Sequence, residues 1–211
     1  MRLIMLGPPG AGKGTQAALV AAAHAIPAIS TGDIFRANIK DATPLGLKVK
    51  EITASGGYVP DEITNAIVRD RLAQDDVSLG FLLDGYPRTT GQVDALDEML
   101  GDAGRRLDAV IELTVDTDEV VQRLLTRAQE QGRADDTENV IRSRMDIYTQ
   151  ETAPLAALYR ERGLLHAVDG MGSVQEVSQR IEQALEAAVQ ARSVEGQGER
   201  PGGPAPGRTH R

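Results

Sequence analysis

A glycine-rich segment, GPPGAGKGT at residues 7–15, follows directly on the apolar residues 2–6. Glycines permit the unusual backbone angles that turn several N–H groups inward, toward a polyphosphate. Lys13 adds a positive charge beside the phosphate that is transferred. A lysine at this point, behind a strand and ahead of a helix-forming stretch, is typical of a phosphate-binding loop. The hydroxyl comes one position later than in the strict pattern, at Thr15 after Gly14.

Two further polar segments follow later apolar runs: STGDIFR at residues 30–36 and DGYPRTTGQ at residues 84–92. Asp84 ends an apolar run, and an acid there is the usual residue that holds a magnesium ion, directly or through water. The first segment by itself could be only a helix cap with Arg36 as a solvated surface charge, and Arg88 could belong to a surface ion pair. Their positions after strands favour substrate binding instead.

A third polar segment, residues 129–137, lies between two expected helices. The arginines in and around it are Arg123, Arg127, Arg133, Arg142 and Arg144, and the acids among them are Asp135, Asp136, Glu138 and Asp146. The segment is either a self-paired network on a solvated face or a lid that carries guanidinium groups over a phosphoryl group when substrate binds. The spacing does not separate these alternatives.

The elements that must position these groups are short apolar runs alternating with helical patterns. The runs are residues 2–6, 26–29, 81–83, 109–115 and 164–168. This alternation predicts an α/β fold with a parallel five-stranded sheet covered by helices on both faces, and ligands at the carboxyl ends of the strands. The long interval from residue 31 to residue 80 predicts a small helical insertion, with helices that start at Pro44 and Pro60.

Composition narrows the class of protein. A length of 211 residues fits one domain, and a net charge of −8 at pH 7 argues against a nucleic-acid partner. The sequence contains no cysteine, hence no disulfide or thiolate zinc site, as is usual in a reducing compartment. It has no apolar stretch of membrane-spanning length, so we expect a cytoplasmic protein. An acidic protein that binds phosphates must gather its arginines locally.

Taken together, GPPGAGKGT, STGDIFR, GGYVPDEIT, LLDGYPRTTGQ, GRADD and RSRM resemble adenylate kinase of the short-lid bacterial type, from residue 1 to about residue 190. The resemblance implies a P-loop NTPase-like fold and reversible phosphoryl transfer from MgATP to AMP, which gives two ADP, balances the adenine nucleotides and serves purine salvage. It also implies a monomer that uses Mg²⁺ and no structural zinc. The implied parts are a kinase domain at 1–192, with core segments 1–29, 60–125 and 137–192, an AMP-binding insertion at 30–59 and a short lid at 126–136. A disordered Gly/Pro-rich tail at 193–211 is expected from the composition.

The resemblance also implies roles for individual residues. The ATP-binding residues are Gly10, Ala11, Gly12, Lys13, Gly14, Thr15, Arg127 and Gly170, and Asp84, with a weaker contribution from Thr15, would hold magnesium. The AMP-binding residues are Thr31, Arg36, Gly57, Tyr58, Val59, Gly85, Tyr86, Pro87, Arg88, Gln92, Arg133 and Arg144. The catalytic residues are Lys13, Arg88, Arg127, Arg133 and Arg144. Four residues separate Arg127 from Gly132, and the alignment therefore allows Arg123 in place of Arg127.

An AMP phosphate is already an anion, so its attack on ATP needs alignment and charge neutralisation but no general base. Two alternatives remain open. One is a phosphate-loop kinase for another acceptor, either UMP or CMP or a hydroxyl compound whose proton Asp33 could accept. The other is a nucleotide-dependent switch, although the closest string to a guanine-reading motif, residues 38–41, has the wrong residue order.

Overall fold

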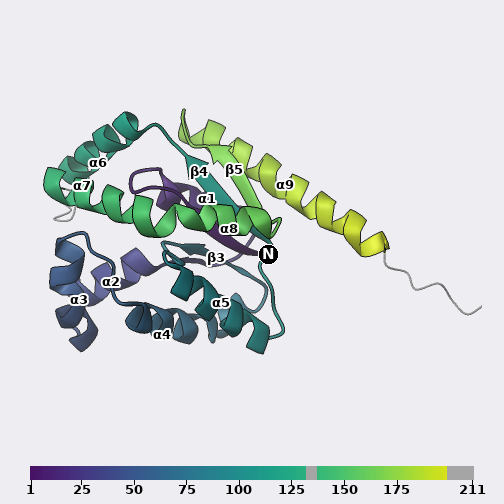
Figure 1. Ribbon diagram of the computed structural model, residues 1–211, viewed down its shortest axis with the longest axis horizontal. Coiled ribbons are helices and arrows are strands. Elements are labelled where there is room, and N and C mark those ends of the chain that lie inside the picture. The colour runs from purple at the N-terminus through teal and green to yellow at the C-terminus, as the bar shows by residue number, and fades with distance from the viewer. Residues whose placement is uncertain (132–136, 199–211) are drawn as a thin grey trace, which may run out of the picture.

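The computed structural model describes residues 1–131 and 137–198. Within them, five parallel strands form one sheet in the order β2-β3-β1-β4-β5. The strands are β1 (Arg2–Leu6), β2 (Ala28–Ser30), β3 (Phe81–Asp84), β4 (Ala109–Thr114) and β5 (Leu165–Asp169). Helices lie on both sides of the sheet (Figure 1). The predicted fold class is confirmed.

Nine α-helices in the described residues connect and cover these strands. They are α1 (Lys13–Ala23), α2 (Thr31–Lys40), α3 (Pro44–Ala54), α4 (Asp61–Leu72), α5 (Thr90–Asp102), α6 (Thr117–Gln131), α7 (Glu138–Ile147), α8 (Pro154–Glu161) and α9 (Val174–Gly198). A short 3₁₀-helix, η1 (Asp75–Val77), precedes β3, and a π-helical turn, η2 (Tyr148–Thr152), joins α7 to α8. In Figure 1, α7, η2 and α8 form one rod across the molecule.

Side-chain alternation along the strands explains why both faces of the sheet are covered. Leu3 and Met5 of β1 pack in one apolar cluster with residues of α1 and α9. Ile4 and Leu6 pack in a second cluster with residues of α4, α5 and α8. All four side chains are at most 4% exposed. A strand buried on both faces reads as a continuous apolar run, which is why these segments could be recognised in the sequence.

The expected insertion between β2 and β3 contains α2 and α3. Helix α3 begins at Pro44, as predicted. Helix α4 begins at Asp61, one residue after the predicted start, and Pro60 is its N-cap residue. Ser30 caps α2 by accepting a hydrogen bond from the backbone N–H of Asp33. Phe35 and Val49 lie in a separate small core with Val59, so the insertion has its own packing.

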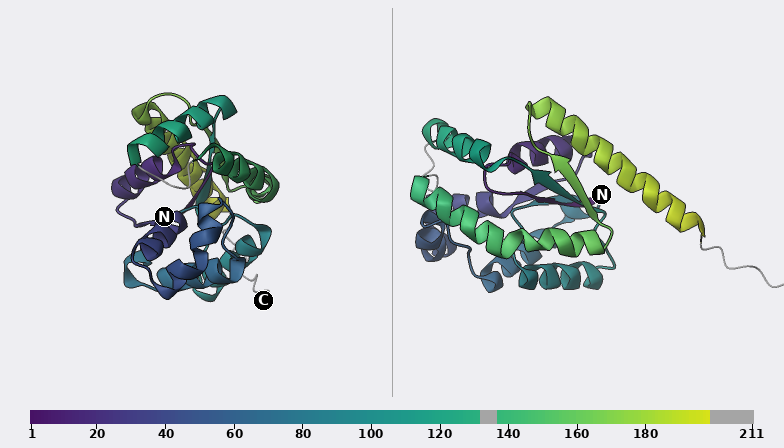
Figure 2. Two further views of the ribbon diagram at one scale, coloured as in Figure 1. Left: turned by 90° about the vertical axis from the view of Figure 1, so that its left-hand side faces the viewer. Right: turned by 45° about the horizontal axis from the view of Figure 1, so that its top comes forward.

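Two helices run further than the sequence indicated. Helix α6 continues to Gln131, so residues 126–131 of the expected lid are helical. Helix α9 continues to Gly198, so residues 193–198 belong to this helix rather than to a disordered tail. Residues 193–198 contain no proline, and elongating an existing helix is easier than starting a new one. The end of α9 projects beyond the sheet (Figure 2). Residues 132–136 and 199–211 lie outside the described part of the chain.

None of the helices within residues 1–131 and 137–198 is both long enough and apolar enough to cross a membrane.

Gly46 lets α3 approach α2 closely. A Cβ atom there would overlap the backbone of Asn38 and Ile39. We therefore expect Gly46→Ala to lower the free energy of unfolding by about 3 kcal/mol, measured by urea denaturation, because neither backbone can yield without repacking the insertion. The matched control is Gly101→Ala in α5, where an added Cβ would have no neighbour within 4 Å. That change should raise stability by about 0.5–1 kcal/mol, and equal effects at the two sites would contradict the explanation.

Candidate active site

The phosphate loop joins β1 to α1, as the sequence predicted. Gly10 and Gly12 have φ angles of 83° and 88°, in the left-handed region that favours glycine. Gly12 precedes α1, and no side chain caps the start of this helix. The first N–H groups of a helix have no partner inside the helix, so an uncapped start of this kind presents donors and a positive dipole end to an anion.

Lys13 lies over the loop. Its Nζ donates hydrogen bonds to the carbonyl oxygens of Gly7, at 2.8 Å, and Pro8, at 2.9 Å. These contacts hold the ammonium group beside the loop whose N–H groups would receive the phosphates. The side chain is half-buried and borders the adjacent cavity.

A cavity of about 750 Å³ opens over the loop. Its walls carry residues that the sequence had placed in separate motifs: Gly10 to Thr15, Arg36, Asp84, Gly85, Arg88, Arg123, Arg144 and Gly170. The strand ends, α2, α6 and α7 bring these groups together, and four of them are arginines. The clustering satisfies the requirement that a chain with a net charge of −8 gather positive charge where phosphates bind.

Asp84 ends β3 and borders this cavity. A Cβ added at Gly14 would lie 3.7 Å from Asp84 Oδ2, so the carboxylate closely approaches the loop. Thr15 borders the same cavity. Magnesium prefers hard oxygen ligands and is usually bound through one or two carboxylates together with substrate phosphates. A carboxylate and a hydroxyl beside a phosphate loop fit that requirement.

A second cavity, of about 460 Å³, lies between α2, α3 and the turn after β3. Of the predicted AMP-binding residues, Thr31, Arg36, Gly57, Tyr58, Val59, Gly85, Arg88, Gln92 and Arg144 border it. Phe35 and Ile39 supply apolar surface, which the flat ring of a nucleobase could pack against. Tyr86 and Pro87 border a smaller cavity of about 50 Å³ instead.

Tyr86 is a buried residue of the turn between β3 and α5. Its side chain is 1% exposed and its hydroxyl donates to Asn65 Oδ1 at 2.7 Å. Burial raises the pKa of Tyr86 and so disfavours its phenolate form. The residue therefore shapes the turn that presents Gly85 and Arg88.

The Gln92 amide is fixed in one orientation. Its Oε1 accepts from the backbone N–H of Arg88 at 2.7 Å, and its Nε2 donates to Asp61 Oδ1 at 2.7 Å. The other oxygen of Asp61 accepts from Thr89 Oγ1 at 2.7 Å. Asp61 and Thr89 were not among the site residues predicted from the sequence. Asp61 follows Pro60 in GGYVPDEIT, where an acid reads only as a helix start.

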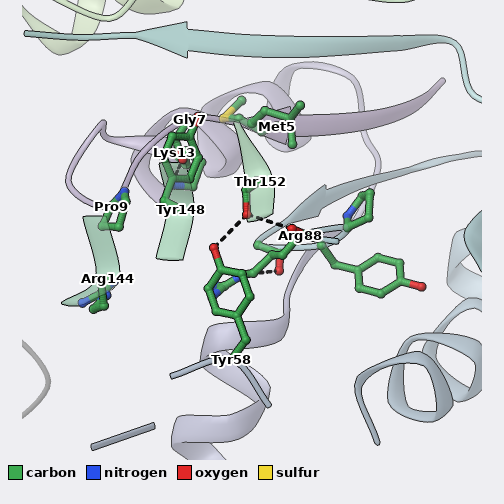
Figure 3. Close-up of a pocket in the computed structure, with 13 residues that line it drawn as sticks. Met5, Gly7, Pro9, Lys13, Tyr58, Arg88, Arg144, Tyr148 and Thr152 are labelled. Atoms are coloured by element: carbon green, nitrogen blue, oxygen red, sulfur yellow. Dashed lines mark hydrogen bonds between the residues drawn. The ribbon is translucent and has the colours of Figure 1, made fainter. Parts of the chain in front are cut away.

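Arg88 differs from the other arginines of the site in its partners. Its Nε donates to the Gly85 carbonyl at 2.7 Å, and its guanidinium lies over the ring of Tyr58, 4.9 Å from the ring centroid (Figure 3). It forms no ion pair with any carboxylate in the described residues. Arg36, in contrast, pairs with Asp33 at 2.6 Å. Arg88 can therefore offer its terminal nitrogens to an anionic ligand.

The lid arginines are only partly within the described chain. Arg144 borders both nucleotide-sized cavities. Arg133 lies outside the described residues, and Arg127 lies in α6 with its side chain outside them. Arg123 borders the larger cavity, where its Nη1 donates to the Gly170 carbonyl at 3.3 Å. Arg142 instead pairs with Glu138 at 2.8 Å on an exposed face.

Comparison with known proteins adds independent findings. A family model described as Adenylate kinase matches residues 5–164. A protein named Adenylate kinase from Nocardioides sp. (strain ATCC BAA-499 / JS614) is 61% identical over 186 residues, which is 88% of this chain and 97% of that protein. Proteins of the same name from Kocuria rhizophila and Leifsonia xyli subsp. xyli are 58% and 60% identical, over 88% and 87% of this chain and 98% and 92% of their own lengths.

Proposed function

Because this chain belongs to the adenylate kinase family, we propose that it transfers the terminal phosphoryl group of MgATP reversibly to AMP, giving two ADP. Membership of this family also makes the enzyme a nucleoside monophosphate kinase. One observation of the site supports this proposal above the others. Gly85, Arg36, Arg88 and Arg144 border both the cavity over the loop and the cavity beside α2 and α3, so two phosphate-bearing ligands would meet at a shared cationic boundary.

The larger cavity is the proposed ATP site. The backbone of residues 10–15 would cradle the phosphates, and Lys13 would reach the β and γ groups. Gly170, together with Arg123 or Arg127, would contact the rest of the nucleotide. Asp84 would hold Mg²⁺ through water, with Thr15 as a further oxygen ligand. The bound ion would neutralise charge on the β- and γ-phosphate oxygens.

The smaller nucleotide cavity is the proposed AMP site. Arg36 and Arg88 would bind the phosphate, while Thr31, the backbone of residues 57–59 and the residue 85–88 turn would enclose the nucleotide. The orientation of the Gln92 amide leaves one N–H and one oxygen lone pair for a ligand. These can pair with the ring nitrogen acceptor and the amino donor on the edge of adenine, while the choice of AMP over a pyrimidine monophosphate rests on the family membership.

The proposed phosphoryl transfer needs no general base. An oxygen of the AMP phosphate forms a bond to the γ-phosphorus, and the bond from that phosphorus to the β–γ bridging oxygen breaks, so ADP leaves. Lys13, Arg88 and Arg144, with Arg127 and Arg133 of the lid, would stabilise the charge on the transferring group. For a hydroxyl acceptor, Asp33 would have to take a proton, and its carboxylate is engaged with Arg36 at 2.6 Å.

Initial rates with MgATP and AMP, UMP, CMP, GMP or shikimate test the proposal. We expect fast ADP formation with AMP and slow or no reaction with the others. Diadenosine pentaphosphate should bind at micromolar concentration or tighter, since it would fill both sites. Preference for a pyrimidine monophosphate or a hydroxyl acceptor, or nucleotide hydrolysis without an acceptor, would overturn it. We also propose that the enzyme acts as a monomer, because one chain supplies both cavities, and that it acts in the cytoplasm.

The structure motivates a direct comparison of Arg123 with Arg127. We expect Arg123→Ala to raise the KM for ATP about tenfold and to leave the KM for AMP unchanged, because Arg123 borders only the larger of the two nucleotide cavities. Arg127→Ala should be measured beside it, with Arg142→Ala as the control, since Arg142 pairs with Glu138 on an exposed face. If the KM for ATP were unchanged in Arg123→Ala but rose strongly in Arg127→Ala, Arg127 rather than Arg123 would be the residue that contacts ATP.

A further inference from the structure

A chain of hydrogen bonds links the AMP-binding insertion to the main chain of Arg88. Thr152 Oγ1 lies 2.9 Å from the Arg88 carbonyl oxygen and 2.7 Å from the Tyr58 hydroxyl (Figure 3). A carbonyl only accepts, so Thr152 donates its single hydroxyl proton to Arg88. Tyr58 must therefore be the donor to Thr152. The order Tyr58 to Thr152 to Arg88 follows from proton counting alone.

The same tyrosine also contacts the Arg88 side chain. The guanidinium lies 4.9 Å from the centroid of the Tyr58 ring, close enough for a cation–π interaction. Arg88 Nε is occupied by the Gly85 carbonyl at 2.7 Å. Tyr58 thus holds Arg88 in two ways. Its ring packs against the Arg88 guanidinium, and its hydroxyl is linked through Thr152 to the Arg88 main-chain carbonyl. Stacking restrains the plane of the guanidinium and leaves its terminal nitrogens free for bidentate contact with a phosphate.

Thr152 occupies an unusual place in the backbone. It ends the π-helical turn η2, in which the N–H of Ala153 donates to the Tyr148 carbonyl at 2.8 Å. A π turn holds one residue more than an α turn and so changes which residue of the rod faces the site. Such turns occur frequently at functional sites. Here the inward residue is Thr152, which is 5% exposed.

We propose that Tyr58, acting through its ring and through Thr152, is a positioning residue that fixes Arg88 for the phosphate of the acceptor nucleotide. The proposal rests on the proposed function, in which Arg88 binds the AMP phosphate. It assigns a role to the Tyr58 side chain, in addition to the backbone contact expected for residues 57–59.

The test compares AMP with adenosine, which has the same base and sugar but no phosphate. For Tyr58→Phe, Tyr58→Leu and Thr152→Val we would measure the KM for AMP and ATP, kcat, and the Kd of AMP and adenosine. The loss of one hydrogen bond should raise the KM for AMP about threefold to tenfold in Tyr58→Phe and in Thr152→Val. Tyr58→Leu, which also loses the aromatic face, should raise it about thirtyfold. The KM for ATP and the Kd of adenosine should not change.

Two variants keep the test selective. Thr152→Ser retains the hydroxyl and should restore the wild-type KM for AMP. Thr149→Val removes a hydroxyl from the same turn, but one whose hydrogen bond within the described residues goes to the Met145 carbonyl, at 2.9 Å, and it should behave like wild type. In the double variant Tyr58→Phe/Thr152→Val, the KM for AMP should rise by less than the product of the two separate fold-changes, because both substitutions break the same chain of hydrogen bonds.

Equal losses of AMP and adenosine binding in Tyr58→Leu would overturn the proposal, because the ring would then only shape the pocket. An unchanged KM for AMP in Tyr58→Phe and Tyr58→Leu would also overturn it. These results are distinct from failure of the proposed function, which would appear in the wild-type enzyme as the absence of AMP phosphorylation.

Discussion

Replacing Lys13 by methionine should lower kcat about a thousandfold, because a positive charge aimed at the transferring phosphoryl group is removed. The Nζ atom lies 2.8 Å from the Gly7 carbonyl and 2.9 Å from the Pro8 carbonyl, so the charge is held against the loop. A preorganised charge of this kind stabilises the transition state more than it stabilises bound ATP. We therefore expect a smaller change in the KM for ATP, measured by coupled assay of ADP formation.

Lys48→Met is the control for Lys13→Met, since Lys48 is an exposed lysine of α3 outside both nucleotide cavities. It should retain wild-type kcat. Both variants should show the wild-type unfolding transition, because methionine preserves the length of the lysine stem. A folded Lys13→Met protein with near-normal turnover would refute the assignment of the loop.

Replacing Arg88 by lysine should lower kcat/KM for AMP about a hundredfold. The positive charge is kept, but lysine lacks the planar fork that can bind two phosphate oxygens. It also lacks the flat guanidinium that stacks on Tyr58, 4.9 Å from the ring centroid. The KM for ATP should change much less, because the loop and Lys13 remain intact.

A matched control for Arg88→Lys is Arg162→Lys. Arg162 also lies over a tyrosine, with its guanidinium 5.7 Å from the centroid of the Tyr159 ring, but it is ion-paired with Asp97 at 2.7 Å. Its replacement should leave the kinetics unchanged. If Arg88→Lys raised the KM for ATP as strongly as the KM for AMP, Arg88 would not be an acceptor-side residue.

Features formed by contiguous residues could be predicted from the sequence. The phosphate loop is one unbroken segment between β1 and α1, and its glycines, its lysine and its flanking elements all lie within residues 2–23. Pro44 starts α3 as predicted, because proline suits the first turn of a helix. The apolar runs of β1, β3 and β4 are continuous because these central strands are largely buried on both faces, whereas the edge strands β2 and β5 also carry exposed residues.

Helix ends were less predictable. The sequence suggested a lid loop from residue 126 and a tail from residue 193, whereas α6 reaches Gln131 and α9 reaches Gly198. Polar residues are compatible with either loop or helix, and a helix already nucleated by its buried face continues at small cost. Arg123 and Arg127 are four positions apart on α6 and so belong to the same face of the helix, and the choice between them depends on how far along α6 the cavity extends.

What the sequence determined by itself is the phosphate loop, the α/β alternation and the motifs that identify the family. The tertiary structure decided how the motifs cooperate. Tyr58 and Thr152 are 94 residues apart and meet at Arg88, and Asp61 reaches Gln92 across 31 residues. The first contact depends on how the insertion and the α7–α8 rod pack against the turn after β3, and the second on how α4 packs against α5. Local residue patterns report burial and backbone angles, and they carry no signal for which distant hydroxyl or carboxylate completes a hydrogen bond.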